Sequence, residues 1–234
     1  MKLENSSQNL EDCNLSLSPL FKHLTTSEVE YLSLDKKVST YKKNIFIYHE
    51  GNRITGCYIV IKGILKIFKT GIDGKEQIIR FARPYDVIAF RSVLSGELAC
   101  TTAKTLEDCT LCYIPQENLV HLIKNNGNFS LALLQLACRE LGEANEYITD
   151  IAQKTVRERL AEILIHLKED FGVDSEQNLQ ISLTREELSN IVGTATESVI
   201  RLLSEFKNDK IIDITGRKIK ILNLNALNKL ACLT

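Results

Sequence analysis

Residues 194–206, TATESVIRLLSEF, combine a face suited to burial with a face that carries charge. Apolar side chains recur at the spacing of an α-helix, at Val199, Leu202, Leu203 and Phe206. Glu197 and Arg201 fall on the opposite face, one helical turn apart. A carboxylate accepts hydrogen bonds and a guanidinium donates them in a planar fork. The pair can therefore bind a polar ligand outside the protein.

The same two residues suit two other roles. An acid and a base at positions i and i+4 of an exposed helix form a surface pair worth about 0.2–0.5 kcal/mol. Glu197 can also complete a capping box with Thr194, which lies three residues before it. The residue types leave all three roles open, so the neighbouring elements must decide between them.

A second short helix is predicted just before this stretch, over residues 185–192, REELSNIV. Thr184 and Glu187 fit a capping box at its start. Gly193 supplies the positive φ that a tight turn needs, and the small Ser189 lets two helices cross closely. Leu188, Val192, Val199 and Leu202 would form the shared core. A short strand is predicted over 179–183 and a β-hairpin that turns at Thr215–Gly216, so the segment indicates a winged helix-turn-helix.

A heptad pattern follows Gly127 and predicts one long helix. Its apolar positions are spaced by 3, 4, 3, 4 and 3 residues. They are Leu134, Ala137, Leu141, Ala144, Ile148 and Ile151. The helix would have about 24 residues and measure about 36 Å. Two such seams can associate, because the alanines let two helices approach closely. The alternative is a helix packed on its own β-domain, which usually shows a wider apolar stripe.

Short β-rich runs separated by Gly, Asp or Pro occupy residues 40–115. The segment KTGIDGKEQ between two of these runs predicts a hairpin. Regular short strands with turn signals indicate an antiparallel sandwich or roll. The fold class expected is therefore α+β, with an antiparallel, jelly-roll-like β-roll before the helices.

Composition is that of a soluble globular chain, with 44% hydrophobic and 25% charged residues among 234 and a net charge of −1. The chain starts without the apolar core of a signal peptide and has no run long enough to span a membrane. Seven scattered cysteines do not indicate a disulfide framework. We expect a reduced, cytoplasmic protein. Walker, G-x-S-x-G and HExxH motifs are absent, and so is a convergent carboxylate pair, so we expect no enzyme.

Taken together, the chain resembles the CRP/FNR family of bacterial transcription regulators over nearly its whole length. The strongest segment is LTREELSNIVGTATESVIRLL, and YIVIKGILKIF and DGKEQIIRF are similar to the family's β-roll. The resemblance implies a helical lead-in over 1–34, a β-roll sensor over 35–126, a dimerisation helix over 127–154 and a winged helix-turn-helix over 155–234. It also implies a homodimer on an inverted-repeat operator in double-stranded DNA, with RNA polymerase as a further partner.

By the same resemblance, Glu197 and Arg201 match the base-reading positions of the recognition helix. A guanidinium can donate two hydrogen bonds to guanine and a carboxylate can accept one from cytosine. Thr196 stands where the cyclic-AMP receptor branch has an arginine that reads another guanine. The expected contacts to DNA phosphates, which position a protein without specifying sequence, are Thr184, Arg185, Ser198, Arg217 and Lys218.

The sensor region departs from the cyclic-AMP-binding pattern. Phe90 stands at the position of the ribose-binding glutamate and Cys100 at that of the phosphate-binding arginine, while Thr101 keeps a hydroxyl. A buried phosphate would go largely unpaired there, which is costly. Arg91 or Arg80 would have to reach the pocket from another direction. We therefore expect that any small-molecule effector is not cyclic AMP.

Cysteines and histidines give no defined cofactor or metal site. Cys112 matches one cysteine of the FNR iron–sulfur cluster, but only Cys13 is left of the N-terminal set, and two thiolates are too few. Cys109 and Cys112 would point to opposite faces of a strand, which favours core packing over chelation. The effector and cofactor stay unassigned. The alternative function is an effector-binding module whose helical C-terminal domain docks on a partner protein instead of DNA.

Overall fold

The computed structural model describes residues 18–232, so Cys13 lies outside the described residues. The chain divides into two compact units. One contains the chain up to Lys69 together with Ile78–Gly142, and the other contains Thr70–Gln77 together with the chain from Glu143 onward. No helix in the described range is both long enough and apolar enough to cross a membrane.

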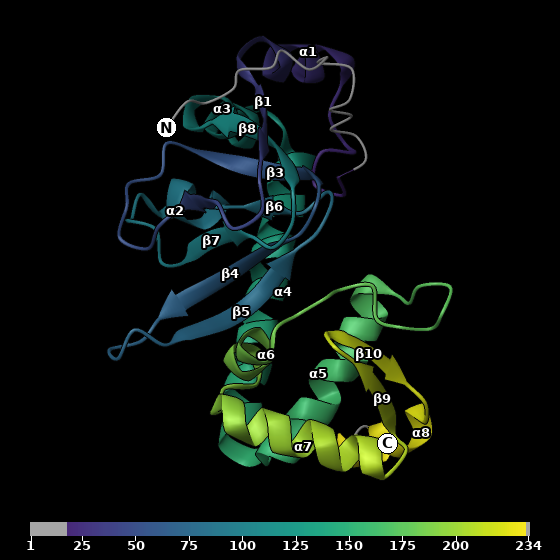
Figure 1. Cartoon of the computed structure of the whole chain (residues 1–234). Helices are drawn as coiled ribbons and strands as arrows, with labels where there is room; N and C mark the ends of the chain where they lie inside the picture. Colours follow the sequence, from purple (N-terminus) through teal and green to yellow (C-terminus); the bar gives the residue numbers. More distant parts are fainter. Residues whose placement is uncertain (1–17, 233–234) are drawn as a thin grey trace. The chain divides into compact units, whose positions relative to one another are not determined.

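The first unit is a β-roll made of two four-stranded sheets (Figure 1). Its strands are β1 (Lys37–Tyr41), β2 (Phe46–Tyr48), β3 (Gly56–Lys62), β4 (Leu65–Thr70), β5 (Glu76–Ala82), β6 (Val87–Ile88), β7 (Thr102–Thr105) and β8 (Cys109–Pro115). The sheet orders are β1-β8-β3-β6 and β2-β7-β4-β5. Strand β8 pairs antiparallel with both β1 and β3, and β7 pairs antiparallel with both β2 and β4. The predicted α+β class with an antiparallel roll is confirmed.

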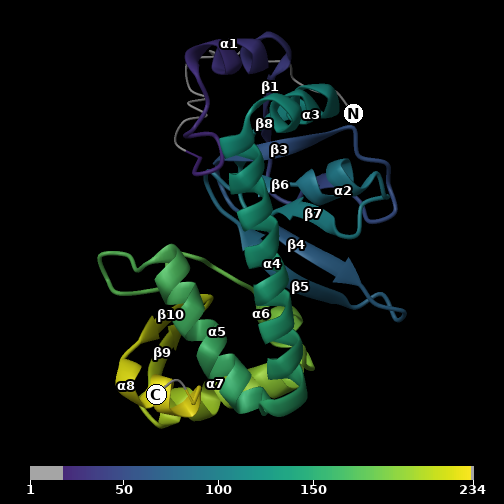
Figure 2. The same cartoon turned by 180° about the vertical axis from the view of Figure 1, so that it is seen from behind.

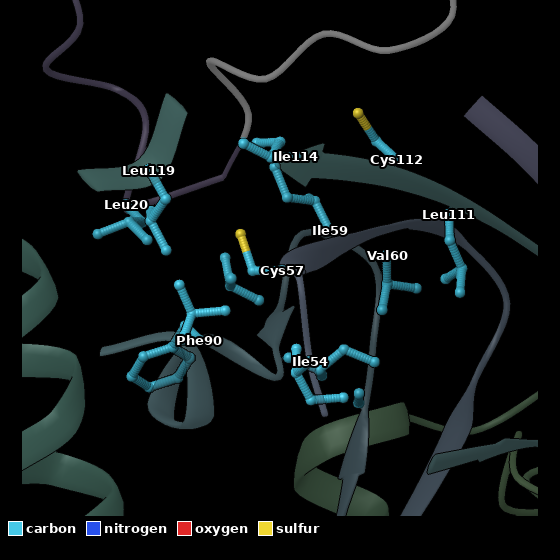
Figure 3. Close-up of a cluster of buried hydrophobic side chains, with 14 of the residues drawn as sticks. Leu20, Ile54, Cys57, Ile59, Val60, Phe90, Leu111, Cys112, Ile114 and Leu119 are labelled. Atoms are coloured by element: carbon cyan, nitrogen blue, oxygen red, sulfur yellow. The ribbon is translucent and has the colours of Figure 1, made fainter. Parts of the chain in front are cut away.

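Short helices cover the first sheet and close its core. They are α1 (Thr26–Asp35), α2 (Phe90–Ser95) and α3 (Gln116–Asn125). Figure 3 shows Leu20, Cys57, Phe90 and Leu119 in this buried cluster, along with aliphatic side chains from β3 and β8. Burial of this apolar surface is the main stabilising contribution to the unit.

The cysteines of the sheet belong to the core, as the strand geometry predicts. Cys57, Cys109 and Cys112 are all fully buried. Burial raises the pKa of the Cys57 thiol to about 12 and that of Cys109 to about 11. Because the thiolate is the reactive form, these side chains behave as small apolar residues.

Helix α4 (Gly127–Gln153) is a single helix of 27 residues (Figure 2). Phe129 and Leu133 near its start are buried, and the Phe129 ring lies 5.4 Å from that of Phe21. The long helix predicted from the heptad pattern is thus present, and it begins at Gly127, seven residues before Leu134, the first residue of the pattern.

The second unit contains the predicted helices and hairpin. Its elements are α5 (Val156–Phe171), α6 (Arg185–Val192), α7 (Thr196–Asn208), β9 (Ile212–Thr215), β10 (Lys218–Ile221) and α8 (Leu224–Leu230). The predicted strand over 179–183 is wrong, because this part of the chain forms only isolated bridges, Val173–Leu179 and Asn178–Lys220. Helix α8, capped by Asn223 and anchored by the buried Leu227, was not predicted.

Gly63 forms the turn between β3 and β4 with a φ of +90°. A Cβ atom built there would lie 2.6 Å from the Cys109 Sγ and 2.7 Å from the Asp108 carbonyl oxygen. Gly74 has a similar φ of +75°, but a Cβ there would meet nothing within 4 Å. Substitution at Gly74 would therefore cost only backbone strain, whereas substitution at Gly63 would add steric contact to that strain.

We therefore expect Gly63→Ala to lower the free energy of unfolding by about 2–5 kcal/mol, the sum of left-handed strain and overpacking. Gly74→Ala should lose only the strain, about 1–2 kcal/mol. Urea unfolding at equilibrium measures both. Equal losses for the two variants would show that contact with Cys109 and Asp108 is not the reason for the glycine.

Candidate nucleic-acid interface

The turn between α6 and α7 is built by three local features. Thr184 caps α6 in a capping box with Glu187, as predicted. Gly193 ends the helix with φ 73° and ψ 51°, a conformation that glycine adopts without a steric penalty. The carbonyl oxygen of Ser189 accepts hydrogen bonds from the backbone N–H groups of Gly193 at 2.9 Å and Thr194 at 3.1 Å. These contacts fix how α7 leaves α6.

The apolar face of α7 fixes the rotation of the helix about its own axis. Val199, Leu202, Leu203 and Phe206 are all buried. Leu188 and Val192 of α6 are buried with them, so the core predicted for the two helices is confirmed. Glu197, Ile200 and Arg201 are exposed on the other side. Any large rotation of α7 would expose its buried face, so the polar face must stay outward.

Both alternative roles of the Glu197–Arg201 pair are contradicted. The N-cap residue of α7 is Ala195 and no side chain caps the helix, so Glu197 forms no capping box with Thr194. The Arg201 guanidinium contacts Glu205, not Glu197, with 2.6 Å between Nη1 and Oε1. Within residues 18–232, the Glu197 side chain forms neither a hydrogen bond nor an ion pair. Its carboxylate is available to an external donor.

Arg201 belongs to a larger ionic network that runs from α7 to α5. The other carboxylate oxygen of Glu205 lies 2.5 Å from Nη1 of Arg157. Nη2 of Arg157 lies 3.3 Å from Asp209, and its guanidinium carbon is 5.1 Å from the centre of the Phe206 ring. A lone exposed pair contributes about 0–1 kcal/mol, but several charges fixed in a network contribute more.

The Thr196 hydroxyl lies 3.0 Å from that of the fully buried Ser189, so it joins α7 to α6. Thr184 acts as the cap of α6, and Ser198 is half-buried. Arg185 donates from Nη2 to the Gly216 carbonyl oxygen at 3.1 Å, which ties the start of α6 to the tip of the β9–β10 wing. Its Nη1 is buried and has no hydrogen-bond partner in the described part of the chain.

In the wing itself, Arg217 and Lys218 are exposed. Nζ of Lys218 lies 3.5 Å from the carboxylate of Glu176, a contact between two exposed side chains that solvent largely screens. The predicted phosphate contacts thus differ in kind: Arg217 and Lys218 are exposed, whereas Thr184 and Arg185 also hold local structure.

The residues of the predicted sensor pocket lie in and around the core of the β-roll. Phe90 is only 3% exposed and is part of the apolar core. Cys100 and Thr101 are half-buried, and Arg91 is exposed. Burial raises the pKa of Tyr48, while a hydrogen bond from Thr101 partly offsets this effect. No acidic or basic side chain stands at position 90 or position 100.

Arg80 and Glu140 form an ion pair near this pocket, which the sequence did not reveal. Nη2 of Arg80 lies 2.9 Å from the Glu140 carboxylate, and both side chains are largely shielded from solvent. The charges of both residues act on the pKa of Tyr48, in opposite directions. Since 60 positions separate the two residues, only the fold brings β5 and α4 together here.

The described residues do not fit an iron–sulfur cluster. Cys112, the one position that matches the family's central cluster ligand, is fully buried in the core. No group of three or more His, Cys, Asp or Glu side chains in the described part of the chain is placed to hold a metal ion.

The predicted seam on α4 is exposed at its large residues. Leu134, Leu141 and Ile148 are 61%, 63% and 66% exposed. Ala144 is exposed as well, whereas Ala137 packs against the core of the β-roll. Ile151 is partly exposed, and its Cδ1 lies 3.2 Å from where a Cβ of Gly193 would be. Leu134, Leu141 and Ile148 are spaced seven residues apart and form an exposed apolar row on α4. Another surface could pack against this row.

Comparisons with known proteins agree with this organisation. Residues 38–126 match the cyclic nucleotide-binding domain, and residues 158–230 match the Crp-like helix-turn-helix domain. The chain is 30% identical to the transcriptional activator protein anr of Pseudomonas aeruginosa, over 94% of this chain and 91% of that protein. It is 28% identical to the fumarate and nitrate reduction regulatory protein of Escherichia coli K12, over 94% and 89%.

Among solved structures, FixK2 from Bradyrhizobium japonicum aligns with a TM-score of 0.75 and 23% identity, covering 83% of this chain and 96% of that one. This likeness extends the agreement to the fold. With a cyclic-nucleotide-type β-roll, a long helix and a winged helix-turn-helix in one chain, the protein belongs to the CRP/FNR family of transcription regulators.

Proposed function

We propose that this regulator binds an inverted-repeat operator in double-stranded DNA, with α7 in the major groove and Glu197 and Arg201 on base edges. The observation that carries the proposal is the fixed outward face of α7, on which Glu197 has no partner within the described residues. A helix-turn-helix places this helix in the groove and reads bases from its exposed face. RNA polymerase is the proposed partner of the DNA-bound protein.

The chemistry of the two side chains specifies the bases. Arg201 can donate two hydrogen bonds to O6 and N7 of a guanine, and Glu197 can accept one from N4 of a cytosine. We propose half-sites that share a GA step, with Arg201 on the guanine and Glu197 on a paired cytosine. Thr196, whose hydroxyl contacts Ser189, would contribute at the edge of this contact.

Replacing Arg201 by alanine should cost about 1–3 kcal/mol of specific binding and relax the preference at one base pair only. Lys218→Ala is the matched control, because it removes a proposed phosphate contact. It should weaken binding to all sequences about equally and reduce the salt slope by about one unit. Randomised-site selection and salt titration with each variant measure both effects. If Arg201→Ala leaves the selected motif unchanged, Arg201 does not read a base, and its only role is the ion pair with Glu205.

Docking of the helical unit on a protein is the alternative function. Retention of the wild-type protein on DNA-cellulose separates the two, because phosphate contacts make DNA binding fall steeply with salt. A protein that passes through at low salt would favour the protein-docking alternative.

We further propose that the exposed row on α4 pairs two copies of the chain in parallel, which would set two recognition helices about 34 Å apart, one turn of DNA. Glutamate at Leu141 and Ile148 should give monomers that bind the operator poorly, because charges would be buried at the seam. Glutamate at Leu98 and Leu222, which lie outside α4 and are 58% and 51% exposed, is the matched control and should leave the dimer intact. Sedimentation velocity measures the assembly. Dimers of unchanged stability in the α4 variant would contradict the seam.

For the sensor domain we propose an effector other than cyclic AMP, or none. Phe90 and Cys100 cannot pair a cyclic phosphate or hold a ribose as an arginine and a glutamate would, and Arg80 is already bound to Glu140. Calorimetry should detect no binding of cyclic AMP at micromolar concentrations. A micromolar affinity that disappears in Arg80→Gln, but not in Arg91→Gln, would contradict the proposal and identify Arg80 as the phosphate ligand.

A further inference from the structure

We infer that Glu205 positions Arg201 for base reading and that Arg157 holds Glu205 in place. The inference rests on the proposed function of Arg201, and it adds two residues that contact no base themselves. Glu205 stands one helical turn after Arg201, on the side of α7 away from Glu197.

Glu205 joins two arginines through its two oxygens. Oε1 lies 2.6 Å from Arg201 Nη1, and Oε2 lies 2.5 Å from Arg157 Nη1. Arg201 is the most exposed of the three side chains, at 67%, whereas Glu205 and Arg157 are each 36% exposed. The network therefore has a solvent-facing end, which is the proposed base-reading group, and an inner end.

The inner end is anchored by more than one contact. Arg157 lies in the first turn of α5, between the two members of the Thr155–Glu158 capping box. Its other nitrogen reaches Asp209, 3.3 Å away at the end of α7, and its guanidinium lies over the Phe206 ring at 5.1 Å. Phe206 is fully buried, so the position of Arg157 is tied to the core of the unit. A planar guanidinium makes these contacts at once, which an ammonium group cannot.

This arrangement affects DNA recognition because it limits the conformational freedom of the Arg201 side chain. An arginine on an open helix face samples many rotamers, and fixing such a side chain on binding reduces affinity by about two- to tenfold. Glu205 restricts the guanidinium before the DNA arrives. Charge is balanced within the network, since Arg157 and Arg201 oppose Glu205 and Asp209, so the network as a whole presents no net charge to phosphates.

Arg157→Lys provides the first test. Lysine keeps the positive charge and has a helix propensity similar to that of arginine, but it lacks the planar guanidinium that contacts Glu205 and Asp209 at once. We expect discrimination at the base pair read by Arg201 to fall by about two- to tenfold, which is less than in Arg201→Ala. The salt slope and the affinity for random DNA should stay as in the wild type. Competition binding with operators that differ at this one base pair measures the discrimination.

Glu205→Gln provides the second test and leaves the contacts of Arg157 with Asp209 and the Phe206 ring in place. Discrimination should fall as in Arg157→Lys, while binding to random DNA should tighten because a negative charge is removed from the DNA-facing helix. Glu169→Gln, at an exposed acid on α5 away from the network, is the matched control and should change neither quantity. Thermal unfolding of each variant checks the fold, and Glu205→Gln decides the matter if Arg157→Lys fails to fold.

A double-mutant cycle separates positioning from a general structural effect. In the Arg201→Ala background, neither Arg157→Lys nor Glu205→Gln should alter discrimination at that base pair any further. Equal effects with and without Arg201, or full discrimination in both single variants, would overturn the inference while leaving base reading by Arg201 intact. If Arg201→Ala itself leaves discrimination unchanged, the proposed base reading fails and the positioning role fails with it.

Discussion

Burial of one face of α7 is the constraint on which the recognition surface depends. Val199 and Phe206 are fully buried, and Leu202 and Leu203 nearly so, so the helix cannot turn about its axis without exposing apolar surface. The α6–α7 turn sets the direction of the helix, and the apolar stripe sets its rotation. Together they determine that Glu197 and Arg201 face away from the core. The outward direction of the polar residues is therefore a consequence of packing.

Charge in the DNA-binding unit is organised by the same packing. Arg157 is held where α5 meets α7, and from there the ionic network extends through Glu205 to Arg201 at the surface. Glu197 stands outside this network. Arg201 and Glu197 lie one turn apart on the same helix but differ in their contacts. Protein contacts restrain Arg201, whereas the Glu197 carboxylate has no partner within the described residues.

In the β-roll, the polar and charged groups around Tyr48 find partners within the chain. Phe90 fills an apolar position, Tyr48 and Thr101 interact with each other, and Arg80 binds Glu140. A charged group enclosed by protein needs a partner, because desolvation of an unpaired charge is costly. The chain thus keeps the fold of the cyclic nucleotide-binding domain, while its core holds the apolar Phe90 and an internal ion pair lies close by.

The sequence by itself determined the elements whose signals are local. Helical periodicity, the Thr184–Glu187 capping box and Gly193 located the helix-turn-helix, and the heptad pattern located α4. The segment over 179–183 was predicted as a strand because its apolar alternation fits one, although the chain meets β10 only at isolated bridges. Only the tertiary structure decided which partner Arg201 takes, since Glu197 and Glu205 both lie one turn away and Arg157, 48 positions from Glu205, selects between them. Local spacing specifies which residues share a helix face, but contacts between residues distant in sequence exist only once the chain has folded.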